Sequence, residues 1–184
     1  MNENNLKTKK LINFGPSGRA IAQPMDNNLL DNFFEHLTME RYANVQYFSI
    51  YLWFKERDLH GFASHFLSES KGEMEHAQKF ADYLIARGQT VKLKDITAPV
   101  QTWDSIEELI SYSFNMEADL TSSLQQLYSI SERISDTRTN VFLDPIVDSQ
   151  TKSEDEFANI LGRVRFASNQ PAAILLIDSD LMKK

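Results

Sequence analysis

A glutamate and a histidine three residues apart form the clearest candidate for chemistry in this sequence. Glu73 and His76 are spaced so that, on a helix, both side chains face one point. A carboxylate and an imidazole placed in this way can share a metal ion, and the carboxylate can bridge to a second ion. A single pair of this kind is more often a solvated surface pair, so further ligands are needed to support a metal site.

Three other helical segments each carry a polar residue in the middle of an apolar stripe. These residues are Glu40, Glu117 and Gln150. An unpaired charge inside a protein costs several kcal/mol, and a bound cation would offset that cost for all of the segments together. Acidic residues from several helices, combined with Glu-x-x-His, are typical of two-metal carboxylate bundles. The four segments together therefore predict a metal site.

The composition restricts the metal and the class of protein. The chain has 184 residues, no cysteine and a net charge of −7. Without thiolates, any metal must bind oxygen and nitrogen ligands, which favours iron, manganese, zinc or magnesium. The negative charge argues against nucleic-acid binding. The longest apolar run, residues 172–177, is shorter than the ~20 residues that a membrane span needs. We expect a cytoplasmic protein without nucleic-acid or membrane partners.

Apolar residues spaced three or four apart predict four long helices, at about residues 26–57, 61–87, 104–134 and 136–166. Glycine and proline cluster before them, so residues 1–25 are predicted to be an irregular extension and residues 26–184 the folded domain.

The connections between these segments predict the topology. Residues 89–103 are long enough to cross a bundle from end to end, so the third helix can run parallel to the second. Asp104 is predicted to cap the third helix. Pro145 should kink the fourth helix or mark its true start. Residues 172–181 are predicted to form a short fifth helix.

At these residues the chain resembles the non-haem ferritins of the bacterial type, in the ferritin-like di-iron superfamily. The resemblance covers nearly all of residues 26–181, and it is specific only as a combination. It implies an all-α, ferritin-like four-helix bundle with a long crossover between helices two and three and a short fifth C-terminal helix. The segments that carry it are Glu40 to Tyr47, Glu73-Met-Glu-His76, Asn115-Met-Glu117, Gln150-Thr-Lys-Ser153 and the tail 174–181.

The resemblance implies a site for two iron ions per subunit. Glu40, Glu73 and His76 would hold the first iron. Glu73, as a bridge, and Glu117 would hold the second, with Gln150 beside it.

Other residues receive roles from the same resemblance. Tyr47 would lie next to the first iron and serve electron transfer or hydrogen bonding to oxygen; it could equally be a core aromatic bonded to a ligand carboxylate. Glu69 would be an auxiliary ligand or a stepping stone for iron, or a plain surface acid. Asp144 and Asp148 would guide iron near a three-fold pore, or simply belong to a charged surface.

The chain also departs from related patterns. A symmetric di-iron enzyme would have a second Glu-x-x-His where this chain has Gln150 and Ser153, so the second iron should bind more weakly. The same departure argues against a bacterioferritin, and no haem is expected although Met74 stands at a position that bacterioferritins use for it. A third, inner iron site is expected to be absent, since its positions hold Gly72, Ser149, Lys152 and Ser153. No ligand partners at helical spacing are assigned to His36, His60 and His65.

The resemblance therefore predicts an iron-storage protein and ferroxidase. Fe(II) would be oxidised by O2 inside each subunit, and Fe(III) mineral would be kept in a homo-oligomeric 24-mer cage. One alternative is a di-iron redox enzyme that acts on peroxide or a small substrate without storage; the missing second Glu-x-x-His and the absence of cysteine count against it. Another is a DNA-protecting shell of the smaller Dps-like type. The ligands within one helix and the fifth helix count against that alternative.

Overall fold

Long helices account for most of the computed structural model, which describes residues 11–183. The helices are α1 (Asn27–Lys55), α2 (His60–Ala86), α3 (Ile106–Arg133), α4 (Thr137–Ala167) and α5 (Pro171–Leu181), preceded by the short strands β1 (Asn13–Phe14) and β2 (Ala20–Ile21). Within residues 11–183, no helix combines the length and the apolar character that a membrane-spanning helix needs.

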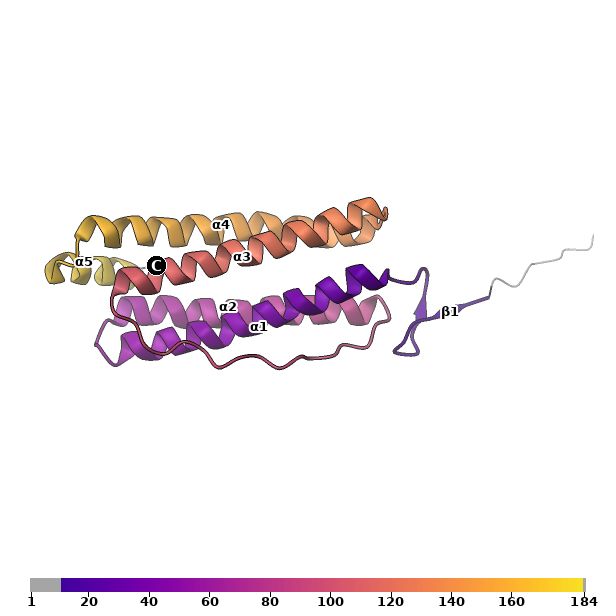
Figure 1. The fold of residues 1–184 in the computed structure, drawn as a ribbon, viewed down its shortest axis with the longest axis horizontal. Helices are drawn as coiled ribbons and strands as arrows, with labels where there is room; N and C mark the ends of the chain where they lie inside the picture. Colours follow the sequence, from indigo (N-terminus) through magenta and orange to yellow (C-terminus); the bar gives the residue numbers. More distant parts are fainter. Residues whose placement is uncertain (1–10, 184) are drawn as a thin grey trace, which may run out of the picture.

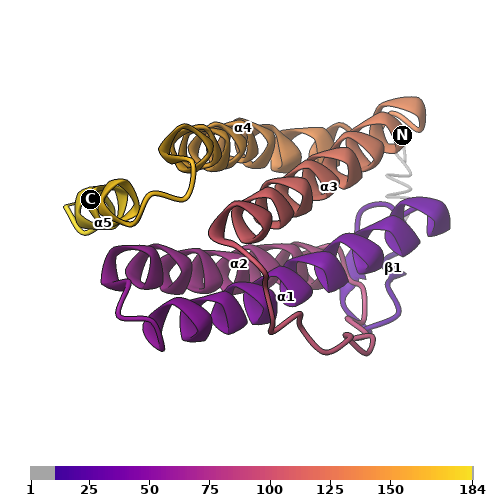
Figure 2. The same ribbon diagram turned by 60° about the vertical axis from the view of Figure 1, so that its left-hand side comes forward.

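The four long helices form two antiparallel pairs, α1 with α2 and α3 with α4 (Figure 1). The crossover segment, residues 87–105, connects α2 to α3. It runs along the outside of α1 to the opposite end of the bundle (Figure 2). As a result α3 runs parallel to α2. The predicted four-helix bundle with a crossover and a short fifth helix is confirmed.

The core consists of two clusters of apolar side chains, one in each half of the bundle. One cluster contains Phe54, Phe62, Phe66 and Phe157, and the other contains Phe33, Phe80, Leu84 and Leu143. Complete burial of one such side chain stabilises the fold by about 1.5–3 kcal/mol. Each of α1, α2 and α4 contributes apolar residues to both clusters. The polar residues of their apolar stripes, Glu40, Glu73 and Gln150, lie between these two sets.

The helix boundaries follow local chemistry, with one difference from the prediction. Asp26 caps α1, accepting a hydrogen bond from the Leu29 amide at 3.1 Å. The predicted cap of α3, Asp104, is wrong by one residue, because Ser105 Oγ accepts the hydrogen bond from the Glu108 amide. The Glu108 carboxylate in turn accepts from the backbone amide of Asp104. Pro145 lies inside α4 and does not mark its start, because α4 is helical from Thr137 onward.

The segment before α1 forms a small hairpin against the end of α2. Ser17 Oγ donates to the carbonyl of Gly88 at 2.9 Å, and a Cβ at Gly15 would lie 2.3 Å from that carbonyl oxygen. Glycine is therefore required at position 15, where the hairpin touches the backbone that follows α2. The prediction of an irregular extension over residues 1–25 did not include these strands, and its residues 1–10 lie outside the described part.

Helix α5 packs across the N-terminal end of α2. The Phe62 amide donates to Asp178 Oδ1 at 2.9 Å, and a Cβ at Gly61 would lie only 1.7 Å from the Asp178 carbonyl oxygen. This contact supplies a partner for an amide at the start of α2, where helices have no internal acceptor.

Candidate metal centre

Three side chains from α1 and α2 meet at the middle of the bundle. One ligand atom from each of Glu40, Glu73 and His76 lies within 4.8 Å of the other two. His76 Nδ1 is 3.0 Å from Glu73 Oε2 and 3.7 Å from Glu40 Oε2. Both carboxylates are buried, while the His76 side chain is 24% exposed. Two carboxylates and one imidazole at this spacing are a suitable donor set for iron.

A second group, from α1, α3 and α4, forms a hydrogen-bonded set within the same interior. The Tyr47 hydroxyl donates a short hydrogen bond to Glu117 Oε1. Gln150 Nε2 donates to the other carboxylate oxygen, Glu117 Oε2, at 2.7 Å and to the Glu117 carbonyl at 3.2 Å. All three residues are buried. Both oxygens of Glu117 therefore accept a hydrogen bond, which fixes the carboxylate, and each keeps a further lone pair for a metal.

Burial and neighbouring charges shift the pKa values of these groups in opposite directions. Burial raises the pKa of Glu73 well above its usual value, and raises that of Glu117 as well. Burial acts in the same direction on Glu40, but hydrogen bonds from His36 and His76 outweigh it and hold the Glu40 pKa well below normal. Hydrogen bonds to Glu40 and then Glu73 raise the pKa of His76 to about 10. Metal-free protein thus keeps protons that a cation would replace.

The buried Tyr47 belongs to the same electrostatic environment. Burial, followed by the charge of Glu117, raises the pKa of the Tyr47 hydroxyl well above 10.0. The neutral phenol is therefore a stable hydrogen-bond donor at physiological pH. Its ring stacks on Phe157 with a centroid distance of 5.6 Å, which fixes its orientation.

His36 is a member of this site that the sequence interpretation missed. Its Nε2 lies 2.9 Å from Glu40 Oε1, and its Nδ1 lies 2.9 Å from Ser123 Oγ. The statement that His36 has no partner at helical spacing is wrong, because Glu40 stands four residues later on the same helix. The i,i+4 spacing was the signal in the sequence that could have revealed it.

The other predicted residues each have neighbours of their own. Glu69 is near His65, with His65 Nδ1 3.9 Å from Glu69 Oε1, and His65 is also 3.8 Å from Glu156. His65 therefore has acidic neighbours, one of them at i,i+4, again contrary to prediction.

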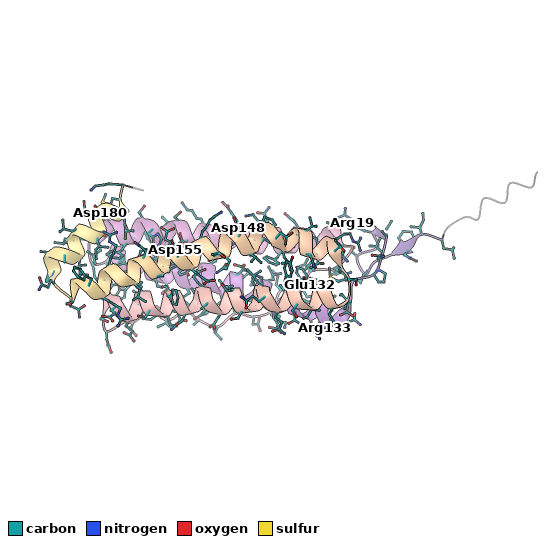
Figure 3. All side chains as sticks on the ribbon, turned by 90° about the horizontal axis from the view of Figure 1, so that it is seen from above. Arg19, Glu132, Arg133, Asp148, Asp155 and Asp180 are labelled. Atoms are coloured by element: carbon teal, nitrogen blue, oxygen red, sulfur yellow. The ribbon has the colours of Figure 1, made fainter. Side chains whose placement is uncertain are left out.

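The two aspartates of α4 also have partners of their own. Asp144 accepts a hydrogen bond from the Tyr128 hydroxyl at 2.9 Å. Asp148 pairs with Lys152 at 2.5 Å on the exposed side of α4 (Figure 3). The charge of Asp148 is thus compensated within the chain, whereas Asp144 accepts a hydrogen bond from a neutral hydroxyl.

Comparisons with known proteins agree with this architecture. The family model described as a ferritin-like domain matches residues 30–167. The chain is 33% identical over 135 residues to the Ferritin-1 heavy chain of Schistosoma mansoni, covering 69% of this chain and 78% of that protein. It is 25% identical over 157 residues to a bacterial non-heme ferritin of Staphylococcus aureus, covering 85% and 95%. An open pore ferritin from Archaeoglobus fulgidus shares the fold, with a TM-score of 0.85, 23% identity and coverage of 88% and 99%.

Proposed function

Because this chain belongs to the ferritin family of iron-storage proteins, we propose that it is a ferroxidase that oxidises Fe(II) with O2 and stores the product inside a protein cage. The observation that supports this proposal most directly is the convergence of Glu40, Glu73 and His76 in the buried middle of the bundle. Iron is the substrate of this site and the stored material.

The geometry supports separate positions for two Fe(II) ions. The first would bind Glu40, Glu73 and His76, whose ligand atoms already lie close together. The second would bind Glu117, with Glu73 as the bridge and Gln150 beside it. Each ion gives one electron, so two ions reduce one O2 to peroxide, which leaves as hydrogen peroxide after taking up two protons. Holding both ions side by side allows this two-electron step to occur in one place.

The residues around the two positions have different tasks in this mechanism. Tyr47 and Gln150 donate to opposite oxygens of Glu117 and so orient its carboxylate. His36 Nε2, 2.9 Å from Glu40 Oε1, packs against the Glu40 carboxylate and restricts its orientation. Tyr47 is also the nearest redox-capable side chain among the residues bonded to the site, which suits a role in electron transfer.

The second position has fewer charged ligands than the first. Gln150 contributes a neutral amide, and the next position on that face, Ser153, adds only a hydroxyl. A weaker position favours release of Fe(III) after oxidation, which is what a storage protein requires. The proposed roles of Glu69, Asp144 and Asp148 in guiding iron stay predictions, as does the absence of haem.

Storage requires many copies, and the surface of the chain supports assembly. Apolar side chains are exposed on α1, on the crossover segment and at the α4–α5 end. They include Phe48, Leu52, Leu93, Phe166, Leu175 and Leu176, with Phe166 94% exposed. Large apolar side chains exposed in this way are typical of protein interfaces. We propose that copies of the chain bury these groups in a homo-oligomer, with the 24-mer cage of ferritins as the expected form.

The site assignment is tested by rapid oxidation kinetics. Glu73→Ala removes the ligand shared by both positions, so the fast rise of ferric absorbance after aerobic addition of Fe(II) should disappear. Glu75→Ala, on the exposed side of the same helix, is the matched control and should keep the wild-type rate. Fast oxidation in Glu73→Ala would show that the site lies elsewhere.

A further inference from the structure

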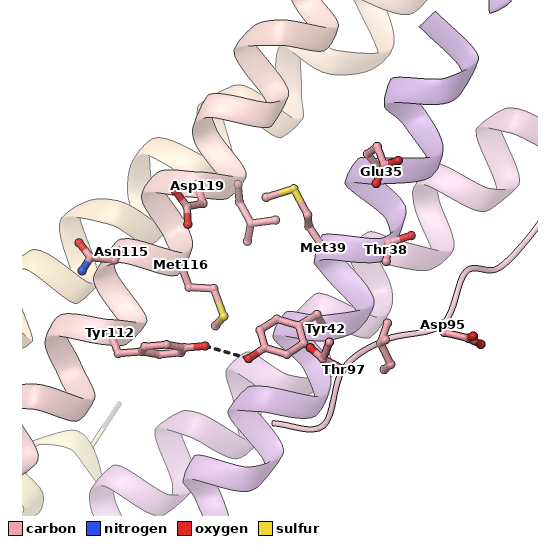
Figure 4. A pocket seen from close by; sticks show the side chains of 12 residues that line it. Glu35, Thr38, Met39, Tyr42, Asp95, Thr97, Tyr112, Asn115, Met116 and Asp119 are labelled. Carbon is pink, nitrogen blue, oxygen red and sulfur yellow. Dashed lines mark hydrogen bonds between the residues drawn. The ribbon is translucent and has the colours of Figure 1, made fainter. Parts of the chain in front are cut away.

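A cavity of about 350 Å³ opens on the face of the bundle that the crossover segment covers (Figure 4). It lies between α1, α3 and residues 95–97 of the crossover segment. Two methionines, Met39 from α1 and Met116 from α3, project into it. The proposed function assigns no role to this cavity.

Two residues that line the cavity are direct sequence neighbours of residues of the metal centre. Met39 directly precedes Glu40 on α1, and Met116 directly precedes Glu117 on α3. Consecutive residues of a helix point about 100° apart. The two methionines can therefore line the cavity while the glutamates that follow them face the centre. Methionine side chains are unbranched and adaptable, so this layer can open more readily than packed branched residues.

The rim of the cavity carries negative charge. Glu35, Asp95 and Asp119 line it, and none of the twelve described lining residues is Lys, Arg or His. Lys94 pairs with Glu35 and reduces its contribution, which leaves Asp95 and Asp119 as exposed acids. Clefts lined by one sign of charge raise the local concentration of the opposite ion.

A second cavity lies on the α2–α4 face of the bundle. It has a volume of about 240 Å³, and its lining residues include His76 and Lys79, with no carboxylate among those described. Lys79 makes this opening less favourable for a cation than the acid-lined cavity on the crossover face.

Hydrogen bonds hold the crossover segment in place beside the acidic cavity. Gln46 both donates to the Val100 carbonyl at 2.9 Å and accepts from the Val100 amide at 2.8 Å. Arg41 donates to the Lys94 carbonyl at 2.7 Å. These contacts flank residues 95–97 on both sides. The segment is thus fixed as a wall of the cavity, so the opening is a built feature of the fold.

We propose that this cavity is the mouth through which hydrated Fe(II) reaches the centre, with Met39 and Met116 as the gate between them. The inference rests on the proposed ferroxidase function and adds the route of its substrate. Asp95 and Asp119 attract the ion, and the methionine side chains move aside to admit it to Glu40 and Glu117. No bond of the iron to the methionines is required.

The charge of the mouth is tested with the double variant Asp95→Asn/Asp119→Asn. At low ionic strength, its initial rate of Fe(II) oxidation should fall about tenfold, and the dependence of that rate on salt should largely vanish. Asp31→Asn/Glu132→Gln is the matched control, since it removes the same charge from exposed positions of α1 and α3. Anaerobic titration with Fe(II) should show unchanged equilibrium binding at the centre in both variants.

A chemical plug provides an independent test, because the chain has no cysteine of its own. Thr97→Cys, at the mouth, is labelled with a bulky neutral maleimide, and Thr102→Cys on the same segment outside the cavity lining is labelled as the control. The plug at residue 97 should slow oxidation clearly, because it blocks the opening, while the particle mass and the control rate stay at wild-type values.

The outcomes separate the two proposals. A wild-type protein that does not oxidise Fe(II) would refute the proposed function itself. If the wild type is active and both the neutralised and the plugged variants keep its oxidation rate, only the proposal that the cavity is the entry route is refuted. A large loss of rate in Asp144→Asn/Asp148→Asn, with no effect at the mouth, would also overturn the inference and assign the route to α4.

Discussion

Neutralising the bridging glutamate should stabilise the metal-free protein and at the same time remove its response to metal. Glu40, Glu73 and Glu117 are all buried, and burial raises the pKa of Glu73 well above 4.5. A carboxyl whose folded-state pKa is raised stabilises the fold at low pH and loses that contribution as pH rises. Glu73→Gln removes this penalty while keeping the shape of the side chain and an oxygen that can accept from His76.

The expected size of the effect follows from these terms. Each unit by which folding raises the Glu73 pKa corresponds to about 1.4 kcal/mol at pH values above it. The neutral amide accepts a weaker hydrogen bond from His76, which returns roughly 0.5 kcal/mol of that gain. The net result is a more stable metal-free protein and a higher Tm, with each 1 kcal/mol of stabilisation equivalent to a rise of roughly 2–4 °C for a chain of this size.

Calorimetry at pH 8 with and without Zn(II), a redox-inert probe, is the assay. Saturating metal at 100 times its Kd should stabilise the wild type by about 2.7 kcal/mol, and Glu73→Gln should lose most of this gain. The order of the two Tm values should therefore reverse on adding metal. Glu75→Gln, an exposed neighbour, should behave as wild type in both conditions. A metal-free Glu73→Gln less stable than wild type, with an undiminished metal response, would refute the argument.

Further predictions concern individual contacts. Tyr47→Phe should slow oxidation in stopped-flow absorbance while anaerobic Fe(II) binding stays intact; lost binding would show that its role is structural. Gln150→Leu should weaken only the second Fe(II) in an anaerobic titration, by about 1–3 kcal/mol, because Glu117 loses a donor; equal weakening of both ions would contradict the two-position scheme. The charged form of His76 stabilises the metal-free protein fully below pH 6.5, and this contribution should be lost as the pH rises through about 10. Chemical denaturation measures the free energy of unfolding across this range, and a value that does not change with pH would contradict the prediction. Gly61→Ala should lower Tm and loosen α5, because its Cβ would collide with the Asp178 carbonyl; an unchanged Tm would be inconsistent with this packing.

The sequence was sufficient to predict the fold and to select polar residues that meet in the bundle interior; their role as iron ligands stays a prediction. Helical spacing of apolar residues reveals which face is buried, and a carboxylate in that stripe is conspicuous because its burial is costly. Glu40, Glu73, Glu117 and Gln150 could all be selected on this basis, and the structure brings them into one interior. The length of the crossover segment was enough to predict the direction of α3.

Features that depend on contacts between distant segments could not be predicted in the same way. The bond of His36 to Ser123 joins α1 to α3, and neither residue type indicates it in the sequence. The mouth depends on the irregular path of residues 95–97 beside two helices, for which periodicity carries no information. The α3 cap was misplaced because Asp104 and Ser105 are both good capping residues, and only the chain geometry decides between them.

The central claim is tested most directly by loading the purified protein with Fe(II) in air while following ferric absorbance and particle mass. Our account predicts fast oxidation and the accumulation of hundreds of iron ions in a particle far larger than a single 21.2 kDa chain. Uptake that stops near roughly two ions per chain, the capacity of a two-metal site alone, would contradict storage and favour a di-iron redox enzyme.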